Sequence, residues 1–189
     1  MDILLSVALG IALSAAAGFR IFVPLLALSI AALTGRVELS AGFAWIGTIP
    51  ALVVFATATV LEVLAYYIPW FDNLMDSIAT PTAVVAGVVA SASVITDLPP
   101  LVKWVVALIG GGGAAGVIQG VSALLRLKST ALTAGLANPL LATAELASSV
   151  FTSVLALVAP LLALAVLFVL ALYAFLAAGR FLFGRSSAP

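Results

Sequence analysis

The residues that could do chemistry in this chain are a few ionisable or amide side chains set within or beside long apolar stretches. They are Arg20, Glu62, Asp72, Asp76, Asn138 and Glu145. A charge at the centre of a bilayer costs about 2.5–3.5 kcal/mol on insertion scales, so a charge inside such a stretch should face protein or water. Together these residues predict a polar path or a binding site for a small solute or a cation.

Arg20 is the strongest single candidate for a functional residue. It lies about halfway along the apolar stretch from Ile3 to Leu33, which is too long for one straight span. Pro24 lacks an N–H and would clash with the carbonyl of Arg20, which predicts a kink there. The guanidinium then either pairs with a buried carboxylate or binds an anionic group in a cavity. We expect the ion pair, with Glu62 or Glu145 within about 8 Å of Arg20.

The carboxylates each have a structural alternative. Glu62 lies one turn before Tyr66 and could make a structural hydrogen bond or an ion pair near the membrane interface, or serve function directly. Asp72 and Asp76 could line one mouth of the polar path, or Asp72 could cap a helix whose positive end Asp76 favours.

Glu145 has hydroxyl-bearing neighbours that could line a wet path or only hydrogen-bond across helices. These neighbours are Thr143, Ser148, Ser149, Thr152 and Ser153. Asn138 and Pro139 open the same segment as a helix start, the arrangement by which broken transporter helices hold substrates.

Two missing residue types exclude much other chemistry. The chain has no His and no Cys, so the usual nitrogen and sulfur ligands for zinc, copper, haem or an iron–sulfur cluster are absent. Only oxygen ligands remain, so we expect no cofactor, with a hard cation as the one possibility. The net charge of +0 offers no basic face for nucleic acid.

The composition predicts an integral membrane protein. Charged residues make up 7% of the 189 positions, against about 25% in soluble domains, and 65% are hydrophobic. Several apolar runs reach the ~20 residues that a helix needs to cross a bilayer. We therefore expect one membrane domain over residues 1–189, an all-α polytopic transmembrane bundle with broken or kinked helices in contact with lipid.

Five apolar stretches have the length of a span and a sixth is ambiguous. The five are Ile3–Leu33, Ala44–Ile68, Asn73–Thr96 with Pro81 inside, Pro99–Arg126, and Val150–Gly179 with Pro160 inside. The sixth, Ala131–Ser149, is broken by Gly135 and Pro139. Six spans are predicted if it crosses, and five with a re-entrant hairpin if it does not.

The distribution of basic residues predicts the orientation. With six spans and a cytoplasmic N-terminus, Arg126, Lys128, Arg180 and Arg185 lie inside, whereas Arg36 and Lys103 lie outside. The rule that positive loops face the cytoplasm therefore favours both termini inside. In either orientation the Asp72 loop and the Arg126 loop share one face.

Small residues repeat every four positions in two of the stretches. They are Gly112, Gly116 and Gly120 in one, and Ala83, Gly87 and Ser91 in the other. Such ridges let helices approach closely in lipid and predict helix association, including a homo-oligomer. A phosphate-binding loop at 110–113 is disfavoured because no Gly-Lys-Ser/Thr follows.

Three groups of residues resemble the bacterial membrane family of domain of unknown function 4126. They are Ala17-Gly18-Phe19-Arg20-Ile21-Phe22-Val23-Pro24-Leu25, then Glu62 with Ile68-Pro69-Trp70-Phe71-Asp72-Asn73 and Asp76, then Asn138-Pro139 with Glu145. The resemblance covers nearly the whole chain and implies a small polytopic bundle in a bacterial cytoplasmic (inner) membrane. It also implies recurring polar positions at Arg20, Glu62, Asp72, Asp76, Asn138 and Glu145. A basic position after the Gly-rich helix matches Arg126 or Lys128 only loosely.

Three functions remain open. The first is a small transporter or channel-like protein with a buried Arg/carboxylate site, in which a proton or hard cation is slightly preferred as the solute. The second is a membrane assembly or scaffold protein that acts through the small-residue ridges. The third is an intramembrane enzyme that holds Mg²⁺ through Asp72, Asp76 and Glu62 for a lipid phosphate reaction, which no established catalytic spacing supports.

Overall fold

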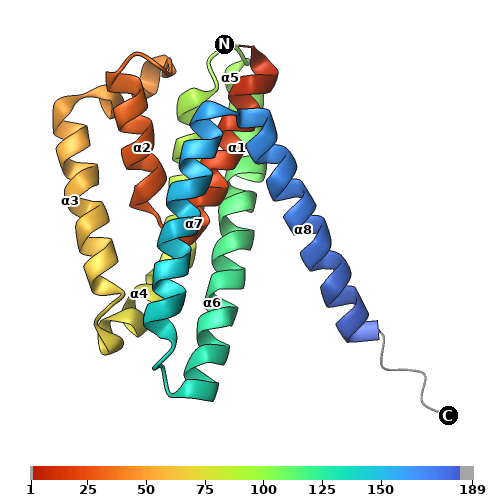
Figure 1. The fold of residues 1–189 in the computed structure, drawn as a ribbon. Helices are drawn as coiled ribbons and strands as arrows, with labels where there is room; N and C mark the ends of the chain where they lie inside the picture. The colour runs from red at the N-terminus through yellow and green to blue at the C-terminus, as the bar shows by residue number, and fades with distance from the viewer. Residues whose placement is uncertain (1, 184–189) are drawn as a thin grey trace.

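The chain folds into a helical bundle, seen here in a computed structural model that describes residues 2–183 without the side chains of 69–77, 174–175 and 177–183 (Figure 1). Its elements are α1 (Ile3–Phe19), α2 (Phe22–Leu33), the 3₁₀ helix η1 (Ala41–Gly47), α3 (Ile49–Ala65), α4 (Pro69–Val94), α5 (Pro100–Val106), the π-helix η2 (Ala107–Gly112), α6 (Gly113–Thr133), α7 (Asn138–Val158) and α8 (Pro160–Phe183). The described part contains no strand, so the all-α prediction is confirmed.

Two of the described helical segments are long and apolar enough to cross a membrane. They are Pro100–Thr133, in which α5, η2 and α6 run on without a gap, and Asn138–Val158. A third span results if η1 and α3, bent by 67° at their junction, are counted as one. These segments indicate a membrane protein. The predicted total of five to six spans stays a prediction, because the other apolar helices among the described residues are shorter.

The first apolar stretch is broken rather than kinked. α1 ends at Phe19, Arg20 is extended with φ −145° and ψ 123°, and α2 begins at Phe22. Pro24 consequently lies in the first turn of α2, where its missing N–H costs no helical hydrogen bond. The expected kink at Pro24 is thus replaced by a complete break just before it.

The two half-helices α1 and α2 run in opposite directions. The Ser14 hydroxyl of α1 donates to the Gly87 carbonyl, and Gly10 faces Ser91, so α1 is antiparallel to α4. α2 is antiparallel to α3, and α3 is antiparallel to α4 (Figure 1). α2 is therefore parallel to α4 and antiparallel to α1. The stretch therefore enters the bundle and returns to the end where it began. This hairpin differs from the one straight crossing that residues 3–33 supply to the predicted span count.

The hairpin of α1 and α2 also brings basic residues to the end of the bundle where α1 starts. Lys103 Nζ donates to Ser40 Oγ at 3.2 Å, which brings the α2–η1 loop beside α5 and the start of α1 (Figure 1). The loop that carries Arg36 therefore lies at the same end of the bundle as Asp2. The prediction of a cytoplasmic N-terminus instead puts these two residues on opposite membrane faces.

α6 and α7 form a second hairpin. α6 continues to Thr133, a tight turn with Gly135 at φ 84° follows, and α7 runs from Asn138 to Val158. The ambiguous stretch 131–149 is thus the end of one helix and the start of the next. α8 begins at Pro160 and runs back, so its far end lies opposite the start of α1 (Figure 1). Within the described residues the start of α1 and the end of α8 lie at opposite ends of the bundle (Figure 1), whereas the sequence favours both termini inside, and the orientation stays a prediction.

The predicted small-residue ridges pack helices within the chain. A Cβ added to Gly87 would lie 2.7 Å from Ala115 Cβ and 2.9 Å from the Gly111 carbonyl oxygen. Gly112 and Gly116 meet valines of α4, whereas Gly120 has no neighbour within 4 Å. Ala83 and Ser91 are fully buried. These contacts join α4 to η2 and α6 at close range.

Candidate functional site

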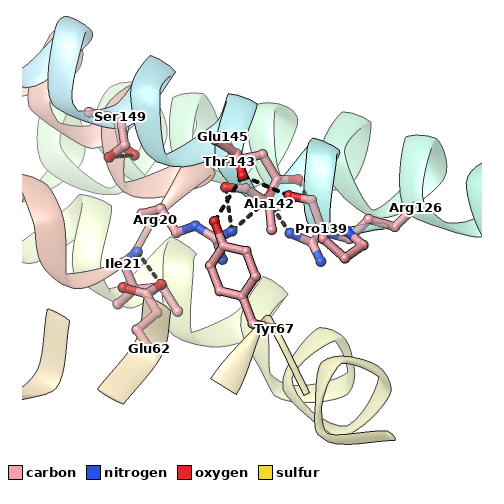
Figure 2. Close-up of polar contacts among 11 residues, drawn as sticks. Arg20, Ile21, Glu62, Tyr67, Arg126, Pro139, Ala142, Thr143, Glu145 and Ser149 are labelled. Carbon is pink, nitrogen blue, oxygen red and sulfur yellow. Dashed lines mark hydrogen bonds and ion pairs between the residues drawn. The ribbon is translucent and has the colours of Figure 1, made fainter. Parts of the chain in front are cut away.

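Arg20 lies inside the bundle at the break between α1 and α2. Its side chain is 1% exposed, and its Nη2 donates to the Ala142 carbonyl at 2.9 Å and lies 3.2 Å from Glu145 Oε2 (Figure 2). The break allows this position because an extended residue between two helices points its side chain across the bundle rather than along a helix face. The predicted ion pair of Arg20 with a buried carboxylate is confirmed, with Glu145 of α7 as the partner.

A second arginine contacts the same carboxylate. Arg126 of α6 donates from Nε to Glu145 Oε1 at 3.1 Å and from Nη2 to Glu145 Oε2. The Arg126 residue is 2% exposed. It had been expected in a cytoplasmic loop after a helix ending near residue 126, but α6 continues for two more turns. Glu145 therefore holds two guanidinium groups together, and the site contains one more cation than the sequence had predicted.

The inward face of α6 contains the signal that could have identified Arg126. Gln119, Ser122 and Arg126 are spaced by three and four residues and are all buried. Polar residues at helical spacing in a membrane helix indicate a face turned toward protein. The basic position implied by the family resemblance also falls near this residue.

An aromatic ring contacts both arginines. The Cζ of Arg20 lies 3.9 Å from the centre of the Tyr66 ring, and the Cζ of Arg126 lies 4.2 Å from it. Tyr66 follows the last residue of α3 and is 6% exposed. Arginine prefers such stacking on aromatic faces, and in a desolvated site each contact is worth up to about 2 kcal/mol. Tyr66 is thus a second site residue that had not been predicted.

Glu62 contacts the backbone at the break. Its Oε1 accepts from the Ile21 N–H at 2.8 Å and its Oε2 accepts from the Phe22 N–H at 3.1 Å (Figure 2). The first N–H groups of a helix have no partner inside the helix, and the dipole there favours a negative charge. Glu62 of α3 therefore caps α2, and at 8% exposed it is buried with the rest of the site.

Two donors of Arg20 remain unused. Its Nε and Nη1 are buried and have no hydrogen-bond partner in the described part of the chain. A buried charged donor without a partner costs several kcal/mol, so such groups are normally met by an acceptor from protein, water or a ligand. The arrangement can therefore bind an acceptor group that the described residues do not provide.

A pocket of about 370 Å³ borders the site between α2, α3 and α4. Its walls are apolar except for Glu62, Tyr66 and Thr82. A second pocket, of about 560 Å³, lies between α1, α6, α7 and α8 and is lined by apolar groups apart from Ser148 and Thr152. Only the first pocket borders residues of the charged network.

The remaining predicted residues lie elsewhere or outside the described side chains. Asn138 starts α7, as expected, and donates from Nδ2 to Thr130 Oγ1 at 3.1 Å, which ties the α6–α7 turn together. It lies two turns from Glu145, at the end of the bundle. Asp72 and Asp76 lie in the first turns of α4, but their side chains are outside the described residues.

Two of the hydroxyls near Glu145 bind across helices, which is one of the two alternatives predicted for them. Ser149 Oγ donates to the Ala16 carbonyl at 2.9 Å, and the hydroxyls of Thr143 and Tyr67 lie 2.8 Å apart. Ser149 thereby fixes the end of α1 against α7, just before the break. No group of three acidic side chains that could hold a metal ion occurs among the residues the structure describes.

The fold and the site together define a helical membrane protein with a charged network buried at a broken helix. The sequence model of a family described as "Domain of unknown function (DUF4126)" matches residues 7–180. The chain belongs to this family, which confirms the resemblance seen in its polar motifs. Neither a curated protein nor a solved structure matches the chain.

Proposed function

We propose that the protein is a small transporter or channel-like protein that moves a solute through the polar site at the α1–α2 break. The observation that supports this most is Arg20 itself, a buried guanidinium at a broken helix whose Nε and Nη1 have no partner among the residues that the structure describes. Broken helices at membrane depth expose backbone groups that can meet a solute, and ionisable residues there are functional candidates.

Each residue of the network has a distinct role in this proposal. Arg20 offers donors to the solute, and Glu145 keeps Arg20 and Arg126 close despite their like charges. Tyr66 covers both guanidinium groups and borders the neighbouring pocket, which serves as the approach from that side. Asp72 and Asp76 are proposed at the mouth, since the start of α4 lies at the same end of the bundle as the α6–α7 turn (Figure 1).

The orientation is part of the proposal. We place the α6–α7 turn and the end of α8 in the cytoplasm of a bacterium, because Lys128 of α6 and Arg180 of α8 belong to that end. The start of α1 then faces outward together with Arg36 and Lys103. Assembly as a homo-oligomer stays a prediction.

The scaffold function has less support. Its ridges at Gly87 and Gly112 are filled by neighbouring helices of the same chain, so they are not free to bind a partner. The enzyme function depends on Asp72 and Asp76 beside Glu62, and the Glu62 carboxylate already binds the backbone of α2.

The test is solute flux in proteoliposomes. The purified chain is reconstituted, and the entry of a panel of small salts and polar solutes is followed by vesicle swelling. We expect one solute class to enter with the native chain, and Arg20→Gln and Glu145→Gln to abolish that entry, while the exposed controls Arg36→Gln and Glu38→Gln retain it. Entry that survives both buried substitutions, or no entry above empty vesicles for any solute, would contradict the proposal.

A further inference from the structure

The start of α2 has the properties of an anion site. It is a helix of 12 residues whose first N–H groups point out of the helix end at Ile21 and Phe22. Free N–H groups and the helix dipole favour a negative group there. In this structure the negative group is the carboxylate of Glu62, which belongs to another helix, α3. The carboxylate occupies the position that a free anion would take.

A second observation points to a ligand at the same place. Arg20 directly precedes these N–H groups in the chain, and its Nε and Nη1 are buried with no hydrogen-bond partner in the part that the structure describes. Glu145 is shared with Arg126 and reaches Arg20 only through Nη2. Among the described residues, Arg20 therefore has more donor atoms than acceptors that reach it, although the formal charges of the two arginines and two glutamates cancel.

A third observation concerns access. The 370 Å³ pocket is bordered by Ile21, Phe22, Glu62 and Tyr66, so it meets the start of α2 at the Glu62 carboxylate. A small ion that enters this pocket reaches the donors of α2 by displacing Glu62. The wall of the pocket is otherwise apolar, which lowers the local dielectric constant. The electrostatic attraction of an anion toward the donors at the break is therefore stronger than in water.

We propose that Arg20 and the first N–H groups of α2 form a site for a small monovalent anion, for which the Glu62 carboxylate is an internal competitor. This inference rests on the proposed function and names its solute class. It replaces the cation that the sequence favoured, because the Glu62 and Glu145 carboxylates are both engaged with donors. Chloride is the probe, since a single atom can take the place of a carboxylate oxygen.

The experiment is chloride titration of the full chain in detergent, followed by calorimetry. Glu62→Gln and Glu62→Ala remove the competing charge, and we expect each to bind chloride about tenfold tighter than the native chain, the effect of losing one charge-assisted contact. Arg20→Gln should bind no chloride, and the exposed Glu38→Gln should match the native chain. Because Glu62→Gln keeps the size and an acceptor oxygen of the side chain, it is the variant to rely on if Glu62→Ala fails to fold.

The outcomes separate this inference from the transport function. Chloride binding that is no tighter in Glu62→Gln than in the native chain, or that persists in Arg20→Gln, would overturn the anion site. Arg20-dependent flux of a cation or neutral solute without chloride binding would also overturn it, while supporting transport. Chloride binding with the predicted order of variants, but without flux of any solute, would support the site and contradict transport.

Discussion

Arg20, from the break between α1 and α2, and Arg126, from α6, share the carboxylate of Glu145 on α7. One acidic group therefore holds together two cations that would otherwise repel each other inside the bundle. The stability of the fold and the chemistry of the site consequently depend on the same residue.

This sharing predicts an unequal response to loss of charge. Glu145→Gln removes the carboxylate that the two buried arginines share and should destabilise the fold by about 3–5 kcal/mol. Arg20→Gln should cost less, because Glu145 keeps Arg126. Thermal unfolding in detergent measures both, with the exposed Glu38→Gln as control. Equal losses of stability in Glu145→Gln and Arg20→Gln would show that Arg126 does not balance the charge of Glu145 when Arg20 is replaced.

The Tyr66 ring should contribute through its contact with both arginines. Tyr66→Leu keeps much of the apolar volume but removes the aromatic face, and we expect a loss of about 1–3 kcal/mol from two buried cation–π contacts. Tyr66→Phe should be milder because it retains the ring. Chemical unfolding of the two variants makes the comparison. If Tyr66→Leu is as stable as Tyr66→Phe, the stacking contributes nothing.

The close approach of α4 to η2 predicts a contrast between two glycines. Gly87→Ala would place its Cβ within 2.9 Å of the Gly111 carbonyl oxygen, a backbone atom that cannot move away easily. We expect overpacking to cost about 1–3 kcal/mol. Gly120→Ala meets no neighbour within 4 Å and should be neutral or stabilising by up to about 1 kcal/mol through helix propensity. Unfolding midpoints that are lowered equally would contradict this packing.

The re-entrant hairpin makes a topological prediction. The chain has no cysteine, so single cysteines report position without background. In sealed vesicles, a membrane-impermeant maleimide should label Asp2→Cys and Arg36→Cys from the same side and Lys128→Cys from the other. Labelling of positions 2 and 36 from opposite sides would restore the single crossing that the sequence indicated.

The ion pair and the helical class were predictable because each depends on composition more than on geometry. A buried arginine needs a carboxylate, and Glu145 was one of two candidates inside apolar segments. Glu62 was the other, and its true partner was hidden because nothing in the sequence showed that α1 would end at Phe19 and leave the N–H groups of α2 open. Pro24 marked the region, but a proline in a first turn does not show where the preceding helix stops.

The small-residue ridge was predictable, but the end of α6 was not. Gly112, Gly116 and Gly120 recur every four residues, and in the structure Gly112 and Gly116 contact valines of α4, as the spacing predicts. The π-helix η2 ends at Gly112, so it changes the register before this ridge and not within it. Arg126 was missed because α6 continues past it to Thr133, which places its side chain inside the bundle beside Glu145.

The most direct test of the account is whether water-borne reagents reach the α1–α2 break. Ile21 borders both the pocket and the Glu62 carboxylate, whereas Leu25, one turn later, is buried in the core. A small charged thiol reagent should modify Ile21→Cys in reconstituted vesicles and leave Leu25→Cys unmodified, and chloride should slow the reaction at Ile21→Cys. An Ile21→Cys that is as unreactive as Leu25→Cys would show that no solute reaches the break, and would contradict the central claim.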